Sequence, residues 1–226
     1  MLGWIICREG KGRPILERRC VGGVWFWVLE GPPAVGWRQR RLWNAALREM
    51  ARRGVHRAVL QGVDAAIPAA CGIIAVDSVG LRRSLLPQLL SWVDREWGLQ
   101  LGSAAVLLSA DSSGTDTWHA AVELSRRARY VTLDTGPGQA ILEEELRSTL
   151  GLGTGGGRPV LEVCLAAEAR GGLPTLYLGH GCGGQQHLTL AAPGLEGVEE
   201  SMLCALFQAE KLPIQDIQVR FVEFRA

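Results

Sequence analysis

Four aspartates stand at or just after the ends of expected buried strands: Asp64, Asp77, Asp111 and Asp134. In a parallel sheet, the carboxyl ends of the strands share one edge, and open α/β sheets bind ligands there. Carboxylates gathered at such an edge suit a divalent cation or an amine, and they disfavour a bare phosphate. Helix capping is the alternative, because aspartate is a preferred N-cap residue and most of these strands precede helices. We favour capping, and we expect no metal site.

The best candidate for a ligand site follows the strand Ala104–Ser109. Its residues are Asp111, Ser112, Ser113, Gly114, Thr115 and Asp134. Strand, loop, helix and second strand occur here in the order of a dinucleotide-binding unit, with an acidic residue at the end. However, the three glycine positions of that fingerprint are Ser109, Asp111 and Gly114, and a carboxylate at the second position repels a pyrophosphate. We therefore expect NAD, NADP and FAD not to bind in the usual mode, and the sequence names no cofactor.

The loop Asp111-Ser-Ser-Gly-Thr115 resembles the D-x-x-G-T nucleophile loop of the haloacid-dehalogenase superfamily. In that family, an aspartate at the end of a strand attacks a phosphorus or carbon centre. The resemblance covers five residues. The loop lies halfway along the chain, Ser113 replaces the acid/base aspartate of the phosphatase members, and a later acidic metal-binding motif is not found. The chain is therefore not assigned to this family.

Two glycine-rich segments resemble phosphate-binding loops. Residues Gly179–Gly184 match G-x-G-x-x-G, but the residues that follow indicate a strand, whereas the fingerprint needs a helix there. The run Gly151–Gly157 follows a helix and precedes a strand, which is the reverse of the required order. We interpret both segments as loops.

Histidine and cysteine provide two further candidates. His180, Cys182 and His187 have metal-binding side chains, but they lack paired C-x-x-C spacing and a fourth ligand. His119, near the start of a helix, could act as an acid or base at physiological pH, but no partner is evident. The sequence contains neither a G-x-S-x-G nor a Walker A motif. No catalytic residue is therefore assigned.

Three strands are expected to form an antiparallel meander at the N-terminus: Leu2–Cys7, Ile15–Cys20 and Val24–Leu29. The third strand contains Trp25-Phe26-Trp27 and is apolar on both faces, so it must be covered twice. We expect these rings to cover an interface, either with the core or with a second copy of the chain or another protein partner.

Helices and strands alternate from Trp37 onward, which predicts a mostly parallel sheet with helices on both faces, a Rossmann-like α/β fold. The strands Arg57–Gln61, Ala104–Ser109 and Tyr130–Leu133 are expected to be neighbours. The C-terminal part predicts a hairpin of Thr175–Gly179 with His187–Leu190, then a helix and a strand. The predicted segments are 1–33, 34–166 and 167–226, packed as one compact unit.

Composition bounds the class of protein. The chain has 226 residues, 24 of them basic and 23 acidic, with a formal net charge of +1. We expect no membrane span, because the most apolar stretch, Ala58–Val79, contains Asp64, Pro68 and Asp77. Scattered cysteines are typical of a reducing compartment, which predicts a cytoplasmic protein. The helix Trp37–Arg53 is rich in arginine, but with a net charge near zero we interpret it as a solvated face, not as a nucleic-acid site.

The function predicted from the sequence is therefore that of a non-catalytic Rossmann-like module that binds a small ligand or a protein partner. The missing glycines and the lack of a nucleophile motif favour this interpretation. The alternative is an enzyme with a carboxylate-lined site, able to hold a divalent metal, around Asp111 and Asp134.

Overall fold

The computed structural model describes residues 1–151, 156–179 and 186–224. The chain divides into two compact units. The first comprises Met1–Ser78 and Ala191–Ile217, and the second comprises Val79–Leu190 and Gln218–Ala226. Both units draw on two separate stretches of the chain, whereas the sequence suggested three consecutive segments.

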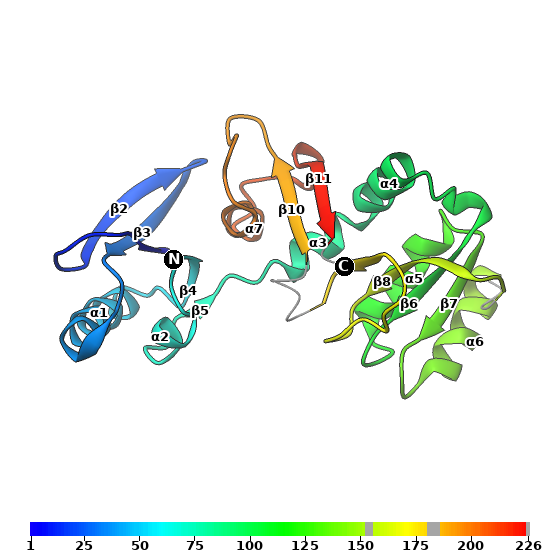
Figure 1. The fold of residues 1–226 in the computed structure, drawn as a ribbon, viewed down its shortest axis with the longest axis horizontal. Coiled ribbons are helices and arrows are strands. Elements are labelled where there is room, and N and C mark those ends of the chain that lie inside the picture. Colours follow the sequence, from blue (N-terminus) through cyan, green and yellow to red (C-terminus); the bar gives the residue numbers. More distant parts are fainter. Residues whose placement is uncertain (152–155, 180–185, 225–226) are drawn as a thin grey trace. The chain divides into compact units, whose positions relative to one another are not determined.

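The first unit contains a five-stranded sheet in the order β2-β3-β1-β4-β5 (Figure 1). Its strands are β1 (Leu2–Cys7), β2 (Ile15–Val21), β3 (Val24–Gly31), β4 (Arg57–Gln61) and β5 (Ile74–Ala75). Its helices are α1 (Gly36–Arg52), α2 (Ala66–Ala69), α7 (Glu200–Gln208) and the 3₁₀ helix η3 (Ile214–Asp216).

The predicted N-terminal meander is only partly correct. Strands β2 and β3 form the expected antiparallel pair, but β1 pairs in parallel with both β3 and β4. Ile5 and Ile6 of β1 are adjacent in sequence and both buried, so this strand is covered on both faces, as an interior strand of a parallel sheet is. The polar strand β2, with Glu17, Arg18 and Arg19, occupies the edge.

Helices cover both faces of this sheet. Ile5 and Leu29 pack with Trp43 and Leu47 of α1, and these side chains are buried in one apolar cluster. On the opposite face, Trp4 of β1 lines a small cavity together with residues of the α7 region.

The three aromatic residues of β3 differ in exposure. Phe26 is fully buried and Trp27 packs against the cluster under α1, whereas Trp25 is 59% exposed. The interface with a second copy or a protein partner at this strand stays a prediction.

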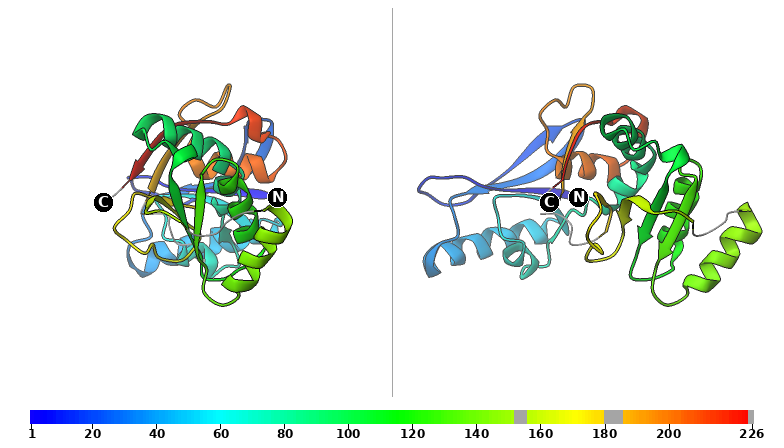
Figure 2. Two further views of the ribbon diagram at one scale, coloured as in Figure 1. Left: turned by 90° about the vertical axis from the view of Figure 1, so that its right-hand side faces the viewer. Right: turned by 45° about the vertical axis from the view of Figure 1, so that its right-hand side comes forward.

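The second unit contains a four-stranded parallel sheet in the order β7-β6-β8-β9, flanked by helices (Figures 1 and 2). Its strands are β6 (Ala105–Ser109), β7 (Tyr130–Asp134), β8 (Pro159–Cys164) and β9 (Thr175–Tyr177), with a separate pair β10 (Gln186–Ala191) and β11 (Gln218–Phe224). Its helices are α3 (Val79–Ser84), α4 (Leu86–Trp97), η1 (Leu101–Ser103), α5 (Thr115–Ser125) and α6 (Gln139–Leu150). The mixed α/β fold class is therefore confirmed.

Two predicted strand pairings are wrong. The strand Arg57–Gln61 belongs to the first sheet, where it pairs with β1 and β5, and only β6 and β7 are neighbours as expected. The residues predicted as a C-terminal hairpin fall in different sheets, because β9 pairs in parallel with β8 and β10 pairs with β11. Alternation of helix and strand predicts parallel units, but it does not say which strands pair.

In the part of the chain that the structure describes, no helix is both long and apolar enough to cross a bilayer.

Candidate functional site

The carboxyl edge of the second sheet is the site that the sequence indicates. Strands β7, β6 and β8 end level with one another, since Ser109 is in register with both Asp134 and Cys164. The chain leaves β6 through α5 toward β7 on one side, and leaves β8 toward β9 on the other side. The direction of the connections thus reverses between β6 and β8, which is where open α/β sheets form a crevice.

Asp111 links the two loops at this reversal. Its exposed carboxylate accepts a hydrogen bond from the backbone N–H of Ala167 at 3.0 Å, which joins the loop after β6 to the loop after β8. The other carboxylate oxygen, Oδ1, has no hydrogen bond within the described residues. Asp111 does not cap α5, so the predicted capping role is wrong for this residue.

Asp134 is held by an arginine. The guanidinium of Arg170 donates two hydrogen bonds to its carboxylate, at 2.7 and 3.2 Å. Hydrogen bonding to Asp134 raises the pKa of Arg170 above its ordinary value, so this guanidinium stays charged throughout the physiological range. Both side chains are about half exposed, and such pairs stabilise a fold only slightly.

The serine-rich loop after β6 makes a side-chain contact with the loop after β7. The Ser113 hydroxyl lies 2.9 Å from that of Thr135, and the Thr117 hydroxyl donates to the carbonyl of Ser112 at 2.7 Å. These contacts fix the chain where it enters α5. The side chain of Ser112 is exposed at the edge.

Helix α5 begins at Thr115, after Gly114, and no side chain caps it. Gly114 has φ −85° and ψ −176°, the extended conformation that N-cap residues adopt. The N–H groups of the first turn therefore face the edge without a side-chain partner, and a helix N-terminus attracts hydrogen-bond acceptors.

A buried carboxylate that the sequence analysis missed supports this edge. Glu162 of β8 is fully buried and accepts hydrogen bonds from the Ser109 and Thr175 hydroxyls and from the backbone N–H of Arg170. It joins β6, β8 and β9 to the loop that carries Arg170. The signal for it was a single glutamate within the apolar run Pro159–Cys164.

The remaining predicted residues lie elsewhere. The carboxylate of Asp64 accepts a hydrogen bond from the Ala66 N–H at the start of α2, as expected of a turn-forming aspartate. His119 of α5 packs edge-to-face against Trp118 and lines a separate cavity of about 200 Å³.

Neither glycine-rich motif is tested by the structure. Residues 180–185, with His180 and Cys182, and residues 152–155 lie outside the described part of the chain. Among the described residues, no group of three or more His, Cys, Asp or Glu side chains is arranged to hold a metal ion.

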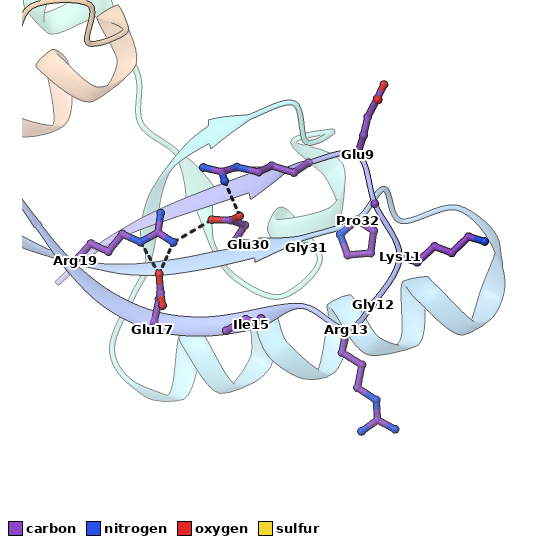
Figure 3. A pocket seen from close by; sticks show the side chains of 12 residues that line it. Glu9, Lys11, Gly12, Arg13, Ile15, Glu17, Arg19, Glu30, Gly31 and Pro32 are labelled. Carbon is purple, nitrogen blue, oxygen red and sulfur yellow. Dashed lines mark hydrogen bonds and ion pairs between the residues drawn. The ribbon is translucent and has the colours of Figure 1, made fainter.

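A polar groove lies in the first unit, at the loop between β1 and β2 (Figure 3). The carboxylate of Glu30 in β3 forms ion pairs with the guanidinium groups of Arg8 and Arg19, each with an N···O distance of 3.0 Å, and Glu17 also pairs with Arg19. Desolvation lowers the pKa of Arg19, but the hydrogen bonds to Glu17 and Glu30 and the charges of these two carboxylates together raise it above its ordinary value. Glu17 and Glu30 in this groove are therefore both paired with arginines.

Comparison with known proteins gives little guidance. No protein-family model matches the chain, and no curated protein matches it. Among solved structures, the chain is similar to L-tryptophan dehydrogenase from Nostoc punctiforme, with 12% sequence identity and a TM-score of 0.32. The match covers 62% of this chain and 43% of that chain, so this chain spans less than half of that structure. A likeness this distant says nothing of what the chain binds.

Proposed function

We propose that the chain is a non-catalytic binding module whose second unit is Rossmann-like and takes a small, uncharged ligand rich in hydroxyl groups. The ligand would lie at the carboxyl edge of β6 and β8, against Asp111 and the first turn of α5. The observation that carries this proposal is the reversal of the connections at an uncapped helix start.

The ligand class follows from the hydrogen-bonding groups at the edge. The first turn of α5 supplies N–H donors, the second carboxylate oxygen of Asp111 is an acceptor, and the Ser112 hydroxyl can serve as either. Hydroxyl groups both donate and accept, so a sugar-like ligand fits this combination. A phosphate fits less well, because Asp111 carries a negative charge and the charge of Arg170 is already matched by Asp134.

Binding is favoured over catalysis because both predicted carboxylates have internal partners. Asp111 accepts from Ala167, and Asp134 is clamped by Arg170. A general base or a metal ligand at Asp134 would first have to give up its contact with Arg170, whereas at Asp111 only Oδ2 is engaged. The alternative of a metal-dependent enzyme is therefore the second hypothesis, and it is tested by the metal titration described in the Discussion.

The decisive variant is Gly114→Asp. An aspartate here has the backbone conformation of an N-cap and only one atom, Ser112 Oγ at 3.9 Å, near its Cβ. Its carboxylate would accept from the first-turn N–H groups and stabilise α5 by a few tenths of a kcal/mol. We therefore expect a protein that is as stable as the wild type or more so, and that no longer binds the ligand.

Binding is measured by calorimetry with adenosine, ribose and glycerol, and with AMP as the phosphorylated counterpart of adenosine. We expect at least one uncharged compound to bind the wild type, AMP to bind more weakly than adenosine, and Gly114→Asp to abolish binding. Gly114→Ala is the matched control, since it adds a Cβ without a capping group and should retain affinity. Binding that persists in Gly114→Asp, or no binding by any of these compounds, would contradict the proposal.

A further inference from the structure

Charge is strongly segregated along the chain although the total is near zero. Residues 1–57 contain twelve Arg and Lys residues and four Asp and Glu residues, whereas residues 58–226 contain twelve and nineteen. The first 57 residues therefore carry a net charge of +8, and the rest of the chain carries −7. Such asymmetry is a feature of chains that bind polyanions.

Helix α1 exposes arginines that lack acidic partners. Arg38, Arg41 and Arg48 lie on the side of the helix opposite the buried Trp43 and Leu47. Within the described residues, none of these three arginines, nor the exposed Arg40, has an ion pair. The four side chains are exposed, as expected of a solvated face, but acidic side chains of the described residues do not neutralise them.

The loop between β1 and β2 extends the same positive surface. The side chain of Gln39 in α1 donates a hydrogen bond to the carbonyl of Gly12 at 2.9 Å, which holds this loop beside the start of the helix. Lys11 and Arg13 project outward from the loop (Figure 3). Neither has an ion pair within the described part of the chain. Together, Lys11, Arg13, Arg38, Arg40, Arg41 and Arg48 are termed the basic surface.

Aromatic rings lie at both ends of α1. Trp37, in the first turn, is 76% exposed. At the far end, the guanidinium of Arg53 lies 4.3 Å from the centre of the Trp27 ring, and that of Arg18 lies 5.1 Å from the exposed Trp25. Exposed rings and stacked guanidinium groups are the planar surfaces on which unpaired bases stack.

We infer that the basic surface and Trp37 bind single-stranded nucleic acid, with the arginines on the phosphates and the tryptophan ring against a base. Charge complementarity favours a polyanion, and the exposed rings favour a single strand, whose bases are open, over a duplex. An acidic protein segment would satisfy the arginines but would give the exposed rings no planar partner.

The experiment measures fluorescence anisotropy of labelled single-stranded 20-mers, oligo(U) and oligo(dT), with the intact chain at several salt concentrations. The test variant combines Arg38→Gln, Arg41→Gln and Arg48→Gln. The matched control combines Arg95→Gln, Arg126→Gln and Arg147→Gln, three exposed arginines in or directly after helices of the second unit, and has the same net charge. Thermal unfolding verifies that both proteins are folded, as expected for exposed positions.

We expect the wild type and the control to bind at least one of the two strands, and the test variant to bind at least tenfold more weakly. For the test variant, the slope of log affinity against log salt concentration should be smaller in magnitude by up to about two, because three phosphate contacts are removed. Trp37→Ala should weaken binding about tenfold and leave the salt dependence unchanged, because stacking releases no counterions.

Three results would overturn the inference. The first is no binding of either strand at low salt. The second is an equal loss in the test and control variants, which would reflect net charge alone. The third is that a duplex or polyglutamate binds as tightly as the single strands, which would assign the surface to phosphates alone or to an acidic protein.

Discussion

At the scale of single residues, the buried Glu162 is the most informative side chain of the second unit. It has no exposed surface, and its neighbours supply hydrogen bonds from two hydroxyls and one backbone N–H. Buried carboxylates are costly unless they are hydrogen-bonded in this way. The residue therefore positions the loop that carries Ala167 and Arg170, and through it the carboxyl edge.

Replacing Glu162 with leucine should destabilise the protein by about 2–4 kcal/mol, because the N–H of Arg170 and the Ser109 hydroxyl lose their acceptor in a buried place, whereas the Thr175 hydroxyl keeps the carbonyl of Leu173. Glu162→Gln keeps one oxygen as an acceptor, so it should lower the free energy of unfolding by about half as much as Glu162→Leu or less. Urea unfolding measures both. Glu168→Gln, an exposed position in the same loop, should change stability by no more than about 0.5 kcal/mol. Equal stability of Glu162→Leu and wild type would disprove the positioning role.

The two carboxylates of the edge should tolerate amide replacement. Asp111→Asn retains an oxygen that accepts from Ala167, and Asp134→Asn loses only an ion pair that is about half exposed. We expect each variant to lose on the order of 1 kcal/mol or less in urea unfolding. Losses of several kcal/mol in either variant would show that the carboxylates have a larger structural role than their contacts indicate.

A metal titration separates the binding module from the metal-dependent enzyme. Magnesium, manganese and calcium are added to the wild type and to the Asp111→Asn/Asp134→Asn double variant while the melting temperature is followed. We expect identical flat responses from both proteins. A rise in melting temperature in the wild type alone would instead support a shared cation at this edge.

At the scale of elements, β1 packs against α1 closely enough to require a glycine. A Cβ at Gly3 would lie 2.6 Å from Cε of Met50 and 2.7 Å from Cγ1 of Val55, both of which are fully buried. The absence of a side chain at this position allows the interior strand and the helix to approach each other.

Gly3→Ala should therefore destabilise the first unit by about 1–3 kcal/mol through overpacking. Gly80→Ala is the contrasting substitution, because Gly80 lies in α3, is exposed, and a Cβ added to it would meet no atom within 4 Å. It should be neutral or stabilise by up to about 1 kcal/mol. Thermal unfolding compares the two, and a stable Gly3→Ala protein would refute the close packing.

At the scale of the whole molecule, the chain forms two sheets with separate buried strands. Leu29 of β3 and Leu161 of β8 are both fully buried, one in each sheet. Replacing either leucine with alanine should lower the free energy of unfolding of the unit that contains it by about 2–5 kcal/mol.

Hydrogen exchange measured by mass spectrometry in urea reports the result. We expect Leu29→Ala to lower amide protection mainly in β1, β3 and β4, and Leu161→Ala to lower it mainly in β6, β7 and β8. If either variant lowers the protection of all these strands equally, the two sheets unfold as one cooperative unit.

The sequence alone predicted the α/β class and most helices and strands, because apolar periodicity and glycine positions act locally. The stripe of Trp43, Leu47 and Met50 predicted α1, and all three side chains are buried in it. The parallel pair β6 and β7 followed from the strand–helix–strand order, and with it the shared edge of Ser109 and Asp134.

Only the tertiary structure decided which strands pair and which charges meet. Pairing depends on burial over long sequence separations, so β1 inserts between β3 and β4, and the residues around Arg57 join a different sheet from β6. The partner of Asp134 is Arg170, 36 residues away, and no local pattern encodes that contact. For the same reason, the near-zero net charge concealed the basic surface, since ion pairing depends on which side chains the fold brings within reach.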